Sequence, residues 1–186
     1  FNGCGSLQGV ISDAKDEITI REGAFDNDPE LRFIALNAAK KLDMYEYVDT
    51  AFVYGVPGCD GGEYGESYVS WICPSYYIRE NAGGILLYGA DEDDRYLLRA
   101  TGNVTGDITL EANTIEIVMY AFVGCDQLTG IVDWGSLIAI GDYSFMKTGV
   151  KQVTITNPSF HYIGYYAFEN CVNLTSVDIE EASGCQ

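Results

Sequence analysis

The chain has 186 residues and a mass of 20.4 kDa, a length that fits one domain. It carries 28 Asp and Glu residues against 10 Lys and Arg residues, so its formal net charge is -18. Such an acidic surface repels phosphate backbones and anionic lipids, which argues against nucleic-acid binding. No apolar run approaches the ~20 residues of a membrane-spanning helix, so we expect no membrane insertion by this segment.

The N-terminal part, residues 1–56, contains related short segments. Strands are expected over residues 7–12, 18–20 and 31–36. Between the last two, Gly23-Ala24-Phe25 predicts a tight turn that places Phe25 in the core. Phe1 and Cys4 match the later part of the same segment, so the chain begins inside a repeat. We therefore expect the native N-terminus, with any targeting signal, to lie upstream of residue 1.

The middle part, residues 57–112, breaks this pattern. Its glycine-rich stretch over 58–65 predicts an exposed loop, and a strand over 69–72 ends before Pro74. Two apolar runs, 85–88 and 95–99, flank a polar turn and predict a β-hairpin. Asp91, Glu92, Asp93 and Asp94 lack the spacing of a calcium loop and are interpreted as a solvated turn.

Residues 113–179 contain the regular repeat, and residues 180–186 form a polar tail. Phe122, Phe145 and Phe168 follow one another at intervals of 23 residues. A tyrosine stands two residues before each of them, and an Ile-Gly pair precedes the last two units. A constant period in the twenties is typical of a solenoid, because each unit is too small to bury its own apolar face.

This pattern of Ile-Gly, Ala-Phe, Cys, Leu and a short strand resembles the BspA-like leucine-rich repeats of cell-surface and secreted proteins. The resemblance implies one α/β leucine-rich-repeat solenoid over residues 1–186. It would be mostly β with short turns or single helical turns, have a parallel sheet on its concave face and carry a β-hairpin insertion in the middle. Stacking of the units predicts a buried phenylalanine ladder of Phe25, Phe122, Phe145 and Phe168. A second stack is predicted for Tyr120, Tyr143 and Tyr166, either as flank packing or as a partly exposed binding stripe.

The six cysteines divide into two groups. Cys4, Cys125 and Cys171 occupy the position three residues after the Phe, and Thr148 fills it in the unit between the last two. Cys125 and Cys171 would lie about two layers, roughly 10 Å, apart, which exceeds the reach of a disulfide. These three are therefore expected to be unpaired thiols. Cys59 and Cys73 could close a disulfide in the irregular region, and Cys185 lies outside the repeat position.

No catalytic or cofactor-binding set of residues emerges from the sequence. His161 is the only histidine, and no nucleophile motif accompanies it, so it is interpreted as a surface or packing residue. The glycine-rich stretch lacks the Lys-Ser/Thr that would follow it in a phosphate-binding loop. Chance pairs of carboxylates leave an enzyme as a remaining alternative, but we expect no enzyme activity, no cofactor and no metal.

Binding is expected on the outward-facing residues of the strands, because the inward-facing ones are committed to the core. These residues are Arg32, Phe33, Thr129, Gly130, Val132, Lys151, Gln152, Thr154, Thr175, Ser176 and Asp178. Phe33 is expected to expose a large apolar side chain, and the irregular segment 57–100 is the rival site.

The resemblance implies a non-catalytic cell-surface or secreted module for recognition or adhesion. Its partner would be an extracellular protein or a glycan, and the domain is expected to be a monomer. The alternative is a structural spacer or self-association module of a larger surface protein.

Overall fold

The computed structural model describes residues 1–37, 39, 41–44, 52–55, 69–81 and 83–180. The predicted loop at 58–65, the Cys59–Cys73 pair, Cys185 and the tail lie outside these residues, at least in part. Contacts divide the chain into two compact units, Phe1–Tyr76 and Tyr77–Gln186. The organisation of residues 1–186 as a single domain stays a prediction.

The first unit is built from two parallel sheets. One sheet has the strand order β1 (Gly9–Ser12), β3 (Phe33–Leu36), β5 (Phe52–Gly55) and β6 (Val69–Ile72). The other pairs β2 (Glu17–Ile20) with β4 (Lys41–Met44). Leu31, Ile34, Leu36 and Leu42 are buried between them, and Phe25 packs against this core. The strand expected over residues 31–36 is therefore present as β3, which begins at Phe33.

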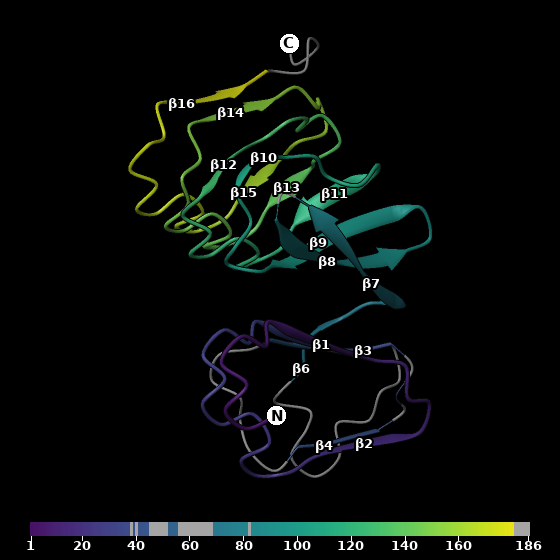
Figure 1. The fold of residues 1–186 in the computed structure, drawn as a ribbon. Helices are drawn as coiled ribbons and strands as arrows, with labels where there is room; N and C mark the ends of the chain where they lie inside the picture. Colours follow the sequence, from purple (N-terminus) through teal and green to yellow (C-terminus); the bar gives the residue numbers. More distant parts are fainter. Residues whose placement is uncertain (38, 40, 45–51, 56–68, 82, 181–186) are drawn as a thin grey trace. The chain divides into compact units, whose positions relative to one another are not determined.

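The second unit begins with the predicted hairpin and continues as stacked turns, which run from teal to yellow in Figure 1. One sheet contains β7 (Ser75–Asn81), β8 (Gly84–Asp91), β9 (Asp94–Ala100), β11 (Thr114–Ile117), β13 (Ala139–Ile140) and β15 (Tyr162–Ile163). Two further parallel pairs are β10 (Gly106–Ile108) with β12 (Leu128–Ile131), and β14 (Gln152–Ile155) with β16 (Ser176–Ile179). The hairpin is confirmed as β8 and β9, which pair antiparallel. Its strand β9 also pairs in parallel with β11, so the stacked turns begin before residue 113.

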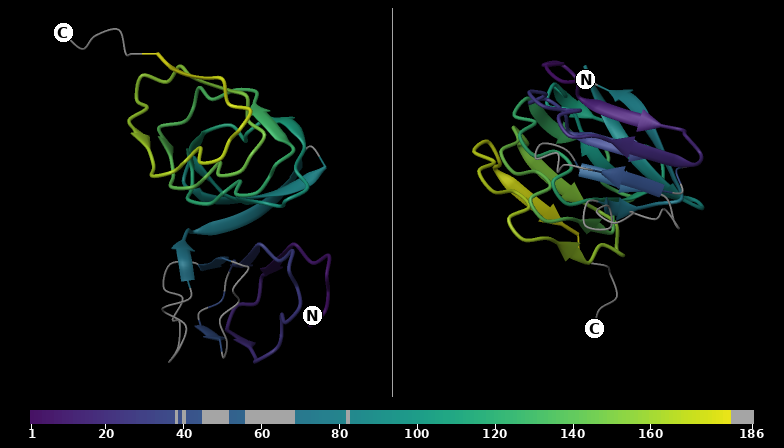
Figure 2. Two further views of the ribbon diagram at one scale, coloured as in Figure 1. Left: turned by 90° about the vertical axis from the view of Figure 1, so that its left-hand side faces the viewer. Right: turned by 90° about the horizontal axis from the view of Figure 1, so that it is seen from below.

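The connections between strands are turns, and the described residues contain no helix. The chain is a β-solenoid of about six turns whose repeats lie about 23 residues apart, which confirms the leucine-rich-repeat fold. Figure 2 shows the successive turns of the second unit lying over one another. Each turn donates backbone N–H groups to the next: Tyr120, Phe122 and Gly124 donate to Asp142, Ser144 and Met146 at 2.7–2.9 Å. Polar groups of the turns are thus paired without a helix.

The phenylalanine ladder is confirmed in the second unit. The rings of Phe122 and Phe145 are stacked with centroids 5.1 Å apart, and those of Phe145 and Phe168 are also 5.1 Å apart. Trp134 packs on Phe145 at 5.6 Å. In the first unit, Phe25 is stacked on Phe1 at 5.5 Å. The ladder residue of each turn therefore packs on that of its neighbour, as the period predicts.

Glycine at 141 and 164 allows neighbouring turns to approach closely. A Cβ atom at Gly141 would lie 2.6 Å from the backbone nitrogen of Met119, and one at Gly164 would lie 2.4 Å from that of Asp142. Both distances are far inside van der Waals contact. The Ile-Gly pair of the repeat thus marks the place where a side chain would push two turns apart.

Candidate binding surfaces

The outward residues of the second unit line an open groove of about 470 Å³ beside β10, β12 and β14. Alternation along β14 explains why Gln152 and Thr154 are available, because they are exposed whereas Val153 and Ile155 are buried. Lys151, which directly precedes this strand, is also exposed. Thr129, Gly130 and Val132 from β12 and its end line the same groove. Six of the residues predicted from the sequence are therefore brought together.

The groove lies where the parallel strands separate. Strands β12 and β14 belong to different two-stranded sheets, although the backbone N–H of Lys151 donates to the carbonyl of Thr129 at 3.0 Å. Beyond this bond, β12 leads into Asp133 and Trp134, and the Trp134 side chain turns inward onto Phe145. Through Trp134, the lining of the groove is thus in contact with the phenylalanine ladder.

Hydrogen bonds and mixed charge characterise the groove. The Thr129 hydroxyl donates to Asp107 Oδ1 at 2.5 Å, and Asp133 Oδ1 accepts from the backbone N–H of Gly135 at 2.8 Å. Lys151 adds an ammonium group, and Thr154 and Thr156 add hydroxyl groups. Asp107, Asp133 and Trp134 were not predicted as binding residues, because they lie outside the expected outward-facing strand positions. This arrangement can hydrogen-bond a polar partner.

The remaining predicted strand residues are distributed differently. Thr175 and Asp178 are exposed beside the groove strands, and Ser176 is half-buried. Arg32 and Phe33 belong to the first unit, where Arg32 is half-buried. The expectation that Phe33 faces water is wrong, because its side chain is only 2% exposed. Its ring occupies the space over Gly9, where a Cβ atom would lie 2.2 Å from Phe33 Cζ.

The predicted tyrosine stack is present on the turns of the second unit. The ring centroids of Tyr120 and Tyr143 are 5.0 Å apart, and those of Tyr143 and Tyr166 are 5.2 Å apart. All three residues have left-handed backbones, with φ of 58°, 53° and 55°. Gly23 takes the same conformation two residues before Phe25. Stacking therefore stabilises a left-handed backbone at tyrosine, a residue type that rarely adopts this conformation.

Exposure increases along the stack. Tyr120 and Tyr143 are half-buried, whereas Tyr166 is 62% exposed. Burial, followed by the charges of the neighbouring tyrosines, Glu169 and Asp142, raises the pKa of Tyr143. Asp142 Oδ1 also accepts hydrogen bonds from the Tyr162 hydroxyl at 3.0 Å and from the backbone N–H of Tyr165 at 2.8 Å. The stack is thus flanked by carboxylates.

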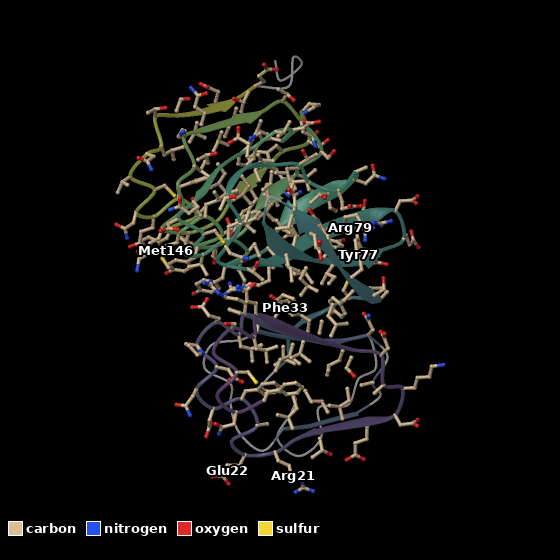
Figure 3. All side chains as sticks on the ribbon, in the orientation of Figure 1. Arg21, Glu22, Phe33, Tyr77, Arg79 and Met146 are labelled. Atoms are coloured by element: carbon tan, nitrogen blue, oxygen red, sulfur yellow. The ribbon has the colours of Figure 1, made fainter. Side chains whose placement is uncertain are left out.

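Strands β7 and β8 carry a second aromatic cluster. Tyr77 and Tyr88 are stacked at 5.6 Å, and the Arg79 guanidinium lies 4.6 Å from the Tyr77 centroid. Figure 3 shows Tyr77 and Arg79 beside each other on β7. Arg79 Nε also contacts Glu111 Oε1 at 2.8 Å. Burial raises the pKa of Tyr88 to about 12.

The repeat cysteines are thiols that bond to the preceding turn. Cys125 Sγ donates to the Thr101 carbonyl at 3.4 Å, and Cys171 Sγ donates to the Phe145 carbonyl at 2.9 Å. Both side chains are buried, whereas Cys4 is exposed. No disulfide joins any two of these three residues in the described chain, which confirms that prediction.

No reactive constellation appears in the described residues. No three His, Cys, Asp or Glu side chains there gather into a group that could hold a metal ion. His161 is exposed, and its Nδ1 lies 2.9 Å from the Ser159 carbonyl. Burial raises the pKa of Glu116, and the charge of His161 partly opposes this increase. The described part of the chain also has no helix that is long and apolar enough to span a membrane.

Comparison with known families identifies the repeat. Residues 96–184 match the family described as BspA type leucine rich repeat region (6 copies). This part of the chain is a BspA-type leucine-rich repeat. No curated protein and no solved structure matches the chain. BspA-type repeats are generally non-catalytic modules of the protein-interaction and surface type.

Proposed function

We propose that the chain is a secreted or cell-surface recognition module that binds an extracellular protein or a glycan. The observation that carries this proposal is the groove, where Lys151, Gln152 and Thr154 are exposed on a strand whose other face is fully buried. Strand β14 is paired with β16 from Gln152 to Ile155, so little backbone entropy is lost when a partner binds to it. The family of residues 96–184 supports an interaction role.

The proposal is tested with immobilised matrix proteins and glycans, against which the purified chain is screened. A groove variant carries Lys151→Ala, Gln152→Ala and Thr154→Ala, all at exposed positions. A matched hairpin variant carries Glu92→Gly and Asp93→Asn, which keep the turn conformation. We expect the groove variant to lose binding and the hairpin variant to retain it. Loss of binding in the hairpin variant alone would assign recognition to the irregular segment instead.

Self-association is the second candidate function. Val177 and Ile179 of β16 are 41% and 45% exposed, although their register partners Val153 and Ile155 are buried. Among the described residues, β16 is an edge strand, and the unpaired backbone groups of an edge strand can pair with another chain. The mass in solution over a range of concentrations distinguishes the candidates, since a recognition module stays monomeric and a self-associating spacer does not.

A further inference from the structure

Two turns of the second unit contain the same three-residue pattern, an asparagine followed by an apolar residue and a threonine. The pattern occurs as Asn103-Val104-Thr105 and as Asn173-Leu174-Thr175, and nowhere else in the sequence. Asn-X-Ser/Thr, where X is not proline, is the acceptor sequence of N-glycosylation. A pattern this short also arises by chance, so its place in the fold decides whether it can carry a glycan.

Both copies occupy the same place in the repeat. The backbone N–H of Val104 donates to the Thr101 carbonyl at 3.3 Å. In the later turn, the backbone N–H of Leu174 donates to the Cys171 carbonyl at 3.0 Å. Val104 is fully buried, and Leu174 packs against the same core. The asparagine and the threonine on either side are exposed in both copies. The middle residue of the pattern is thus used for packing, whereas both acceptor residues lie at the surface.

This place is exposed in internal turns as well. Asn103 lies in one of them, and Gln127 is its equivalent in the following turn, two residues before Thr129. The turn of Gln127 has a bonded neighbour on each side. The Gly106 N–H donates to the Gln127 carbonyl at 2.8 Å, and the Lys151 N–H donates to the Thr129 carbonyl at 3.0 Å. Gln127 is nevertheless exposed, so the exposure belongs to the place in the repeat.

The asparagine amides can each give up one hydrogen. Asn103 Nδ2 donates to the Gly83 carbonyl at 2.7 Å, and Asn103 Oδ1 accepts from the Thr101 hydroxyl at 2.6 Å. Because Nδ2 carries two hydrogens, a sugar can replace one while the bond to Gly83 is kept. No hydrogen bond joins the Asn173 side chain to another of the described residues. Both amides are therefore available as acceptors in the folded chain.

We propose that Asn103 and Asn173 are N-glycosylation sites. This inference rests on the proposed secreted or cell-surface role, because the sugar donor, an oligosaccharide on a lipid pyrophosphate, is met during export. In the transfer, Nδ2 forms a bond to the anomeric carbon of the first sugar and loses one proton. The bond from that carbon to the phosphate oxygen breaks, and the lipid pyrophosphate leaves. Neither asparagine lines the groove, so the modified positions are separate from the recognition residues.

The test is export of residues 1–186 from a eukaryotic cell behind a cleavable signal, with cells and medium collected together. Peptide N-glycosidase removes N-glycans and converts each glycosylated asparagine to aspartate, which peptide mass spectrometry detects against an untreated sample. We expect conversion at Asn103 and Asn173 and at no other asparagine. Thr105→Ala and Thr175→Ala should each abolish one conversion, because the acceptor sequence needs the hydroxyl. Thr105→Ser and Thr175→Ser keep a hydroxyl and should retain both conversions.

Two further variants test whether the place in the fold directs the modification. Gln127→Asn completes the pattern at the equivalent exposed place, and it should gain a third conversion. Pro158→Ala completes the pattern at Asn157, whose Nδ2 donates to the carbonyls of Ser136 at 3.2 Å and Leu137 at 3.0 Å. Because both bonds occupy this amide, the Pro158→Ala variant should gain no conversion.

Absence of conversion at either Asn103 or Asn173 in the exported chain would overturn the proposal. Conversion that persists in the Thr→Ala variants would do the same. Conversion of Asn157 in the Pro158→Ala variant, or none at the new site of Gln127→Asn, would contradict the structural argument for these two places. Unglycosylated chain made in bacteria can still enter the binding screen, so a failure here leaves the proposed groove function standing.

Discussion

Replacing Phe145 by alanine tests the phenylalanine ladder at its centre. Phe145 is fully buried, stacks on Phe122 and Phe168 at 5.1 Å each, and contacts Trp134 at 5.6 Å. Removing a buried phenylalanine costs about 3–5 kcal/mol of folding free energy. Each lost aromatic pair accounts for about 0.5–1.5 kcal/mol, which favours the upper end of that range. We therefore expect Phe145→Ala to lower the free energy of unfolding by about 5 kcal/mol, measured by urea denaturation.

Phe168→Ala is the internal comparison for this measurement. Phe168 is half-buried and has a stacking partner in Phe145, so its removal leaves a smaller cavity. We expect it to cost about half as much as Phe145→Ala, because both the buried area and the aromatic contacts are smaller. Equal losses for the two variants, or a loss below about 1 kcal/mol for Phe145→Ala, would refute the stacked ladder.

Three further predictions concern other tyrosines and the cysteines. In urea denaturation, Tyr143→Ala should be less stable than Tyr143→Gly by about 1 kcal/mol. Both variants lose the tyrosine stack, but only alanine keeps the strain of the left-handed backbone at this position. A glycine variant less stable than the alanine variant would contradict this explanation. Since the pKa of Tyr88 is raised to about 12, its stabilisation is complete below pH 10 and falls by about 2 kcal/mol as the pH rises to 12. Tyr88→Phe should lack this component of the pH dependence. Native alkylation followed by peptide mass spectrometry should modify Cys4 rapidly and Cys125 only after unfolding.

The sequence period predicts equivalence between residues, and this part of the fold is confirmed. Residues separated by 23 positions occupy equivalent places in successive turns. The stacking of Phe122 on Phe145 and of Tyr120 on Tyr143 therefore follows directly from the spacing. The hairpin could be predicted because its polar turn separates two apolar runs. Its strands continue through Gly89 and Ala90, however, so that the turn is shorter than expected.

Other features depend on contacts that the period does not encode. All four residues of β3, Phe33–Leu36, are buried, so the alternation that assigned Phe33 an outward side chain does not predict its burial. Strand β4 was not predicted, because the alternation of its sequence, KLDM, covers only four residues, and its pairing with β2 is not visible in the sequence. The left-handed tyrosines could not be predicted either, since tyrosine disfavours this conformation unless a neighbouring turn holds it.

The expected strand residues anticipated half of the groove. Gln152 and Thr154 follow from the alternation of β14, whose Val153 and Ile155 point inward, and Lys151 directly precedes this strand. Asp107 reaches the groove from the turn before, through its hydrogen bond with Thr129, and nothing in its local sequence indicates this contact. The sequence of a single repeat therefore predicts only part of a groove that residues from several turns line.

The most direct test of the recognition surface is chemical-shift mapping of the 20.4 kDa chain with the partner found in the binding screen. Backbone amides are assigned, and shift changes are followed as the partner is added. The groove assignment predicts that the largest changes fall on residues 129–134 and 151–156. Changes confined to the hairpin, residues 84–100, with an unchanged groove would contradict it.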